Sequence, residues 1–296
     1  MSSIKSLAMH CLVALAFLAA TDALADANSA KAAYFQNREK LSYEVQSAAS
    51  SVAREDTLVR GVYRLEDRAS GRFIALITER GDLKGDSTGW TIVGPDGPVD
   101  LTDAQARQLR QEVMSRVRWD QLIRVTYGDG GARRLILVSA VNCPYCRKME
   151  ANLAKSATTL RTTFYVLPSS LTPLNASDEG QRTWSQAADL WCAHDDGGAS
   201  WKAFWVTHQA PRNQACPLDA ASAQQLFRNF GIVMASIGVK VRGTPALIRE
   251  DGEVFGVPPD FDADYASKTY GPAGMPATDA APAATEDAVW LTAPRH

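Results

Sequence analysis

The chain has 296 residues, about twice the usual length of one domain, so its length predicts two domains of roughly 100 to 150 residues each. Hydrophobic residues make up 46% and charged residues 22% of the chain, as in an ordinary globular protein. The formal net charge of −2 gives no basic surface for nucleic acid and no polyacidic tail, so we expect no nucleic-acid partner.

The chain begins with a segment typical of a secretory signal peptide. Lys5 precedes an apolar run over 11–20, and residues 23–25 (Ala-Leu-Ala) give a small-x-small cleavage pattern. The apolar run is too short to span a bilayer, which takes roughly 20 apolar residues. Lipid attachment at Cys11 is less favoured, because the residues before it are not the small and apolar set that such processing prefers. We therefore expect residues 1–25 to be removed and the mature protein to be periplasmic.

Residues 26–101 are predicted to form a small α+β domain. Helical spacing of apolar residues predicts a first helix over about 34–54. Short β-prone runs follow at 61–65, 72–77 and 89–93, and the segment closes with a turn over 95–98 (Pro-Asp-Gly-Pro). The module has no cysteine, no histidine and no phosphate-binding glycine loop, so we expect it to carry no covalent chemistry.

A linker helix is predicted over 102–118. Thr102 and Gln105 have the spacing of a capping box, and apolar residues then follow along one helical face. Beyond it, the runs 122–127 and 134–140 are predicted as two strands of a hairpin, separated by a glycine-rich turn. Residues 135–138 are apolar on both faces, which predicts the buried centre of a sheet.

The remaining elements predict an α+β domain over 119–270 with a helical insertion at about 178–238. The expected order is a helix at 144–155, a strand at 163–167, helices at about 183–192, 201–208 and 220–237, and strands at 246–248 and 254–255. Residues 271–296 are rich in Ala and Pro with little periodicity and are predicted to be a disordered tail.

Removal of the signal peptide leaves four cysteines, an even number in a compartment where disulfides persist. Three pairings are possible. Cys143 and Cys146 form a Cys-x-x-Cys, whereas Cys192 and Cys216 stand apart with a polar, Pro-containing loop between them. The spacing favours a reactive pair of Cys143 with Cys146 and a structural pair of Cys192 with Cys216.

The Cys-x-x-Cys lies where a buried strand leads into a helix. Unpaired backbone N–H groups and the positive end of the helix dipole favour a thiolate at Cys143. Cys146, nearly one turn on, can attack the mixed disulfide that Cys143 forms with a substrate. Pro144 and Tyr145 between them would tune the redox balance and, with Thr244 and Pro245, are expected to contact the substrate.

Two other roles of this pair are weaker alternatives. Zinc would need two more ligands at metal-like spacing, and Cys192 and Cys216 do not form a second Cys-x-x-Cys. A structural disulfide across two residues would be strained and readily reduced, which again favours redox use. We also expect no metal at the histidines: His10 leaves with the signal peptide, His296 lies in the predicted tail, and His194 and His208 have no partner at metal-like spacing.

A second feature is Thr244-Pro245, directly before the apolar run 246–248. A cis Thr244–Pro245 bond would present the backbone of Thr244 as a template for a bound substrate chain. The simpler interpretation is a proline that merely starts a strand.

Several motifs together resemble the periplasmic disulfide isomerases of the DsbC/DsbG family. They are Asn142-Cys143-Pro144-Tyr145-Cys146, Leu190-Trp191-Cys192-Ala193 with Trp201-Lys202, Cys216, and the run from Gly238 to Ala246. The similarity covers about 122–257, with the motifs in family order.

The resemblance implies a thioredoxin fold with a helical insertion, Cys143 as nucleophile, Cys146 as resolving cysteine and a cis Pro245 facing them. It also implies a structural disulfide between Cys192 and Cys216 and a membrane-bound thiol reductant as partner. In the family the N-terminal region is a dimerisation domain joined by a helix, and residues 26–118 fit that plan only in outline; on this basis we expect a homodimer.

Three functions follow as hypotheses, none requiring a cofactor. The first is an isomerase or reductase of wrong disulfides in unfolded or misoxidised secreted proteins, and the second is a dithiol oxidase that donates its disulfide. The third is a redox-independent chaperone or assembly factor of a secretion or conjugation apparatus, to whose surface Trp201, Phe204 and Trp205 could contribute. Their helical spacing favours core positions instead.

Overall fold

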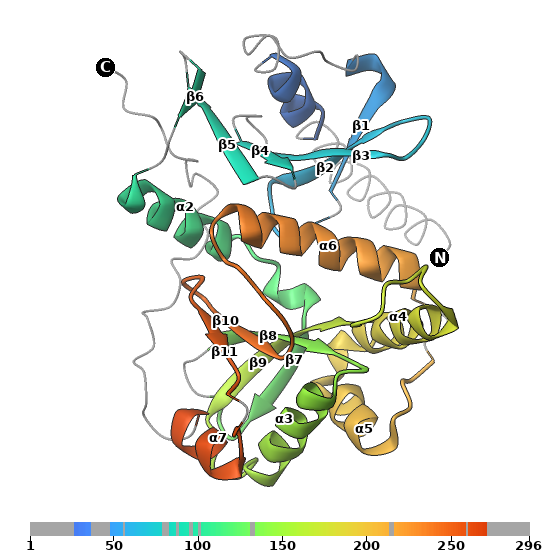
Figure 1. Cartoon of the computed structure of the whole chain (residues 1–296), viewed down its shortest axis with the longest axis vertical. Helices are drawn as coiled ribbons and strands as arrows, with labels where there is room; N and C mark the ends of the chain where they lie inside the picture. Colours follow the sequence, from blue (N-terminus) through green and yellow to red (C-terminus); the bar gives the residue numbers. More distant parts are fainter. Residues whose placement is uncertain are drawn as a thin grey trace, which may run out of the picture. The chain divides into compact units, whose positions relative to one another are not determined.

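The computed structural model describes residues 27–36, 48–55, 57–78, 83–86, 89–94, 97–99, 102–130, 134–212, 216–258 and 260–270 (Figure 1). The predicted signal peptide and the predicted tail lie outside these residues. The described residues fall into two compact units, which divide between Leu101 and Thr102. Among them, no helix combines the length and apolar character that crossing a membrane requires.

The N-terminal unit is built on a sheet of six antiparallel strands in the order β1-β2-β3-β4-β5-β6, so each strand pairs with the next along the chain. The strands are β1 (Ser51–Arg54), β2 (Val62–Asp67), β3 (Phe73–Thr78), β4 (Leu83–Asp86), β5 (Gly89–Gly94) and β6 (Gly97–Val99). The three predicted runs correspond to β2, β3 and β5. The predicted turn over 95–98 is wrong at its end, because Gly97 and Pro98 pair with β5.

The helix predicted over about 34–54 can be compared with the structure only at its two ends, because residues 37–47 lie outside the described residues. Residues 27–36 are helical, and their buried Ala27, Ala30 and Tyr34 recur at intervals of three and four. This face packs on Tyr63, Leu65 and neighbouring apolar residues of β2 and β3. The end of the prediction is wrong, since residues 48–50 form a 3-10 turn and β1 pairs with β2. A long-range strand partner has overridden the local helical spacing.

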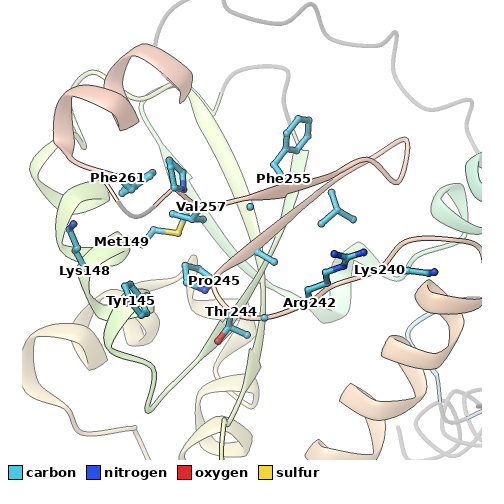
Figure 2. Close-up of a pocket in the computed structure, with 15 residues that line it drawn as sticks. Tyr145, Lys148, Met149, Lys240, Arg242, Thr244, Pro245, Phe255, Val257 and Phe261 are labelled. Carbon is cyan, nitrogen blue, oxygen red and sulfur yellow. The ribbon is translucent and has the colours of Figure 1, made fainter.

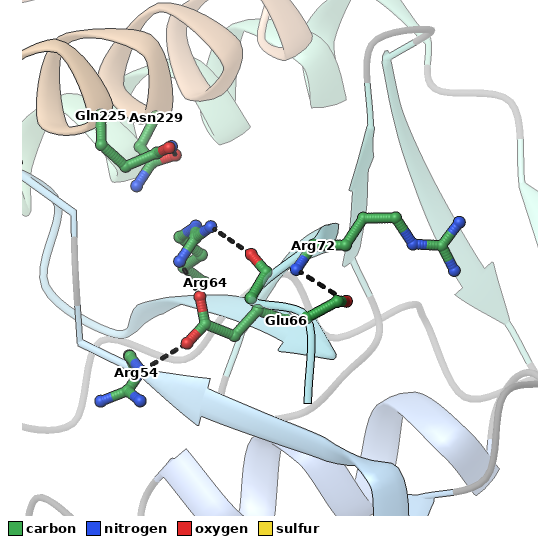
Figure 3. A network of polar contacts seen from close by, with 8 residues as sticks. Arg54, Arg64, Glu66, Arg72, Gln225 and Asn229 are labelled. Atoms are coloured by element: carbon green, nitrogen blue, oxygen red, sulfur yellow. Dashed lines mark hydrogen bonds and ion pairs between the residues drawn. The ribbon is translucent and has the colours of Figure 1, made fainter. Parts of the chain in front are cut away.

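A buried carboxylate joins two strands of this unit. Glu66 on β2 is only 6% exposed and pairs with Arg54 on β1 and with Arg64 on its own strand (Figure 3). Two guanidinium groups therefore offset the cost of burying one charge.

The C-terminal unit is built on a mixed sheet of five strands in the order β11-β10-β8-β9-β7. β8 runs parallel to β9, and the other neighbours are antiparallel. The strands are β7 (Ile123–Tyr127), β8 (Arg134–Ala140), β9 (Thr162–Ser169), β10 (Ala246–Arg249) and β11 (Val254–Gly256). The apolar β8 is the central strand, as its sequence predicted, and leads directly to Cys143.

The predicted hairpin between the first two strands of this unit is wrong. β9 lies between β7 and β8 and pairs with both. Gly128 has a φ of 61°, and a Cβ there would lie 2.2 Å from the carbonyl oxygen of Leu160. The glycine-rich segment thus turns the chain against the residues that precede β9 and does not close a hairpin.

Helices cover both faces of this sheet. Figure 1 shows α3, α5 and α7 on one side and α4 and α6 on the other; α3 contacts α5 and α7, while α4 contacts α6 and β9. The helices are α2 (Asp103–Ser115), α3 (Pro144–Lys155), α4 (Asp178–Trp191), α5 (Ala199–Thr207), α6 (Ala220–Ser236) and α7 (Ala263–Tyr270). Short 3-10 turns span Trp119–Gln121 and His194–Asp196.

On α6, Gln225 Nε2 donates a hydrogen bond to Asn229 Oδ1 (2.7 Å; Figure 3).

The start of α2 confirms the predicted capping box. Thr102 accepts a hydrogen bond from the Gln105 backbone, and the Gln105 side chain accepts one from the Thr102 backbone. The helix belongs to the C-terminal unit, where Arg110 Nε donates to the carbonyl oxygen of Ile237 (3.4 Å).

The sequence did not predict α7. Its ends are held by long-range hydrogen bonds, since Ser156 Oγ donates to the carbonyl oxygen of Ala263 (2.7 Å) and Thr162 Oγ1 donates to that of Tyr270 (3.0 Å). A helix of two turns depends on such tertiary contacts more than on its own propensity.

Candidate functional site

The candidate active site begins at the N-terminus of α3. Cys143 is the N-cap residue, with extended backbone angles, and Pro144 occupies the first helical position. The backbone N–H of Cys146 donates a hydrogen bond to Cys143 Sγ (3.4 Å). The sulfur of Cys143 therefore accepts a hydrogen bond from an otherwise unpaired N–H group at the positive end of the helix.

The second cysteine lies deeper. Cys146 is 0% exposed, and its Sγ accepts a hydrogen bond from the backbone N–H of Ala140 (3.4 Å). Burial raises the pKa of the Cys146 thiol to about 12. Both cysteines are buried free thiols, and Cys143 is the one whose sulfur contacts the loop that precedes β10.

That loop carries the second predicted feature. The Thr244–Pro245 peptide bond is cis, and the carbonyl oxygen of Thr244 accepts a hydrogen bond from Cys143 Sγ (3.4 Å). Pro245 is followed at once by β10, which pairs with β8. Adjacent central strands thus bring together Cys143 and Thr244, which are 101 residues apart in the chain.

An aromatic side chain of the insertion reaches the same place. Trp205 on α5 packs against the cluster of Ala140, Cys143 and Cys146. Its indole Nε1 is buried and has no hydrogen-bond partner among the described residues. Trp201 and Phe204 are 1% and 2% exposed, which confirms core positions for these two and leaves them no part in an exposed chaperone surface. Sequence reasoning weighed Trp205 only as core or surface and did not place it beside the cysteines.

A fully buried carboxylate lies farther along α3. Glu150 Oε1 accepts a hydrogen bond from Trp201 Nε1 (3.0 Å). A separate contact joins the next residue of α5 to β7, since Lys202 Nζ lies 4.8 Å from the ring centroid of Tyr127. Burial raises the pKa of Glu150 to about 8, although the contacts with Trp201 and Lys202 oppose the shift. Burial also raises the pKa of Tyr127. Sequence reasoning did not identify this group.

A pocket of about 430 Å³ opens beside Pro245 (Figure 2). Its walls come from α3, the loop 240–245, β11 and the segment that follows β11. Most of the lining is apolar and includes Met149, Phe255 and Phe261. Three cations, Lys148, Lys240 and Arg242, also line the pocket. Tyr145, which stands between the two cysteines in the sequence, is 64% exposed and lines this pocket.

The other two cysteines lie apart from this site. Cys192 and Cys216 are joined by a disulfide with a Cα–Cα distance of 5.8 Å, and Cys192 is the C-cap of α4. The bond ties the end of α4 to the segment that leads into α6. Among the described residues, no three His, Cys, Asp or Glu side chains are grouped as metal ligands.

These features define the class of domain. Residues 122–263 match the thioredoxin-like domain, and the C-terminal unit has the corresponding strand, Cys-x-x-Cys helix and cis-proline loop. The chain is thus an α+β protein with a thioredoxin-like domain that carries a helical insertion, preceded by a separate N-terminal unit.

Solved structures of thiol–disulfide proteins are similar to this chain at low identity. A disulfide interchange protein from Neisseria gonorrhoeae is 21% identical, with 51% of this chain and 96% of that chain covered and a TM-score of 0.36. A periplasmic thioredoxin-like protein from Salmonella enterica serovar Typhimurium is 15% identical (58% and 97% covered, TM-score 0.37). DsbG from Helicobacter pylori is 12% identical (67% and 93% covered, TM-score 0.32). No curated protein matches the chain in sequence.

Proposed function

We propose that the protein is a periplasmic thiol–disulfide oxidoreductase that isomerises or reduces wrong disulfides in secreted proteins. The observation that carries the proposal is the position of Cys143 Sγ, between the N-terminus of α3 and the carbonyl oxygen of Thr244. A sulfur in this position is activated by the helix and lies beside backbone that an extended substrate can pair with.

The chemistry follows in two steps. The thiolate of Cys143 attacks one sulfur of a substrate disulfide, a mixed disulfide forms, and the other substrate sulfur leaves as a thiolate. In reduction, Cys146 loses its proton and attacks Cys143 Sγ, which releases the first substrate sulfur and closes the Cys143–Cys146 disulfide. Two electrons pass to the substrate, and a membrane-bound thiol reductant supplies two others, which reduce the Cys143–Cys146 disulfide again.

The environment of Cys146 supports isomerisation over net reduction of the substrate. A thiol whose pKa is raised to about 12 is almost entirely protonated at neutral pH, so it attacks the mixed disulfide slowly. The delay gives a second thiol of the substrate time to displace Cys143 instead, which is isomerisation. A dithiol oxidase is the alternative function. It would need a reduced Cys143–Cys146 pair that is strongly stabilised relative to the disulfide.

The N-terminal unit has no place in this chemistry. We propose that it pairs two copies of the chain, so that two Cys143 sites serve one misfolded substrate. A solution mass of two chains for the full mature protein, against one chain for residues 102–296, supports this role; one chain in both cases contradicts it.

The test of the activity uses a scrambled substrate with several disulfides and the full mature protein. Wild-type protein is expected to accelerate recovery of the native substrate, and Cys143→Ser to abolish the effect. Serine keeps an oxygen at the N-cap of α3, so the loss reports chemistry and not capping. A Ser177→Ala variant, which removes the N-cap of α4, is the matched control and is expected to remain active.

Direction is tested in cells by trapping free thiols with an alkylating reagent. An isomerase or reductase is expected to hold Cys143 and Cys146 mainly as thiols, whereas a mainly oxidised pair contradicts this direction and supports the oxidase. Activity that survives Cys143→Ser would contradict the whole proposal.

A further inference from the structure

The pocket beside Pro245 has a positively charged lining. Its lining includes Lys148, Lys240 and Arg242 and contains no carboxylate. Among the residues that the structure describes, Lys240 and Arg242 have no ion-pair partner, and both are exposed. Figure 2 shows them on the side of Pro245 away from Lys148. A positive patch of this kind attracts anionic groups along the approach to the site.

The two cations are placed to act as a pair. Lys240 and Arg242 lie two residues apart in the segment without regular structure that leads from α6 to Thr244. Arg242 is itself two residues before Thr244, whose carbonyl oxygen accepts from Cys143 Sγ. A chain bound beside Thr244 therefore passes these side chains within a few residues of its reacting cysteine, given about 3.3 Å per extended residue.

The interior of the same pocket is apolar. Met149 and Phe261 are buried, Phe255 and Pro245 are half-buried, and all four line the cavity. A volume of about 430 Å³ has room for one large aliphatic or aromatic side chain. β11, at the edge of the sheet, supplies a further wall, and an edge strand is where an extended peptide can add.

We propose that this pocket selects partner segments in which a large apolar side chain is flanked by carboxylates. The apolar side chain fills the cavity, and the carboxylates pair with Lys240 and Arg242. The inference deepens the proposed function, because it names the class of segment that is presented to Cys143.

The probes are peptides of equal length that carry one cysteine as a mixed disulfide with uncharged mercaptoethanol. In the first, a Phe next to the cysteine is flanked by Glu; in the others the flanks are Lys or Gln, or Ser replaces Phe. The reduced full-length protein gives up two electrons, closes its Cys143–Cys146 disulfide, and releases the peptide thiol and mercaptoethanol.

At low salt we expect the Glu peptide to react about tenfold faster than the Lys peptide, and salt at about 0.5 M to remove most of the difference. The Ser peptide is expected to react more slowly than its Phe counterpart.

Charge reversal identifies the residues. The double variant Lys240→Glu/Arg242→Glu is expected to prefer the Lys peptide. The matched control, Lys155→Glu/Arg182→Glu, changes two exposed cations outside the pocket by the same charge and is expected to keep the preference for Glu. Equal rates for Glu and Lys peptides in wild-type protein, or an equal inversion in the control, would overturn the inference.

The Gln peptide separates this inference from the proposed function. If the Gln peptide is reduced and the Glu and Lys peptides react at equal rates, the proposed selectivity of the pocket is rejected and the proposed function stands. If no peptide is reduced, the proposed function fails. In that case the selectivity of the pocket is tested by binding alone. Fluorescence anisotropy measures the affinity of the same peptides with Ser in place of Cys, and tighter binding of the Glu peptide than of the Lys peptide supports the preference for an acidic segment.

Discussion

The Sγ atom of Cys143 lies 3.4 Å from the carbonyl oxygen of Thr244, although 101 residues separate the two in the chain. The contact forms because β8 and β10 are antiparallel neighbours, with Val138 opposite Ala246, so β8 ends at the edge of the sheet where β10 begins. A substrate backbone that pairs with Thr244 would therefore be held against the sulfur that attacks it. This proximity is the structural basis of the proposed activity.

Cys146 should resist ionisation far beyond neutral pH. Burial raises the pKa of its thiol to about 12, so a Cys143→Ser variant is expected to show no thiolate at this position up to about pH 10. The ultraviolet absorbance of the thiolate measures this directly, with the Cys143→Ser/Cys146→Ser variant as the blank. An ionisation midpoint near the ordinary cysteine value of 9.0 would contradict the buried environment.

Glu150 should make the folded state less stable as the pH rises. Its folded pKa of about 8 lies above its ordinary value of 4.5, so between these values the folded protein holds a proton that the unfolded chain has lost. The stabilisation is fully present below about pH 4.5 and is lost as the pH rises through about 8. The slope approaches about 1.4 kcal/mol per pH unit for one such group.

The variant Glu150→Gln is expected to lower this slope and to be the more stable protein near pH 9. Urea unfolding at several pH values measures both effects. Glu179→Gln, a change at an exposed carboxylate on α4, is the control and is expected to leave the slope as it is in the wild type. An unchanged slope in Glu150→Gln would show that another group carries the pH dependence.

The disulfide between Cys192 and Cys216 should stabilise the C-terminal unit without taking part in the chemistry. It closes a loop across a sequence separation of 24, and chain entropy predicts a stabilisation of about 3 kcal/mol. The double variant Cys192→Ala/Cys216→Ala is expected to lose about that free energy of unfolding in a denaturant titration. At low temperature, where it remains folded, its reaction with disulfides should match the wild type; a lost reaction would connect this bond to the site.

The two tryptophans of α5, Trp201 buried and Trp205 partly buried, should respond differently to the same substitution. Trp201 Nε1 donates to Glu150 Oε1, whereas Trp205 Nε1 has no partner among the described residues. Replacement by Phe removes a similar ring volume in each case, but only Trp201→Phe leaves a buried acceptor unpaired. We expect Trp201→Phe to lower the free energy of unfolding by about 2 kcal/mol more than Trp205→Phe; equal losses would contradict this account.

Much of the site follows from local sequence. The strand 134–140, Cys143 at a helix start, Pro144 at the first helical position and the helix to Lys155 all agree with the structure. These features depend on a continuous apolar run and on capping, which act between residues close in the chain. The capping box at Thr102 was predictable for the same reason.

The failures occur where distant segments decide the outcome. The hairpin between β7 and β8 was wrong because periodicity shows which face of a strand is buried and does not show which strand lies beside it. Likewise, residues 51–54 form β1 because a strand partner is present in β2. Trp205 beside the cysteines and Glu150 beneath Trp201 could not be placed, since both depend on how α5 packs against the rest of the domain.

The sequence by itself determined the pair Cys143–Cys146 at a helix start and the Thr244-Pro245 step before a strand, because local spacing and backbone chemistry suffice for both. The family resemblance implied that these two features face each other, but only the tertiary structure decided it, together with the position of Lys240 and Arg242 in the lining of a largely apolar pocket beside them. The physical reason is that contacts between distant segments depend on strand order and helix packing, which no local pattern encodes.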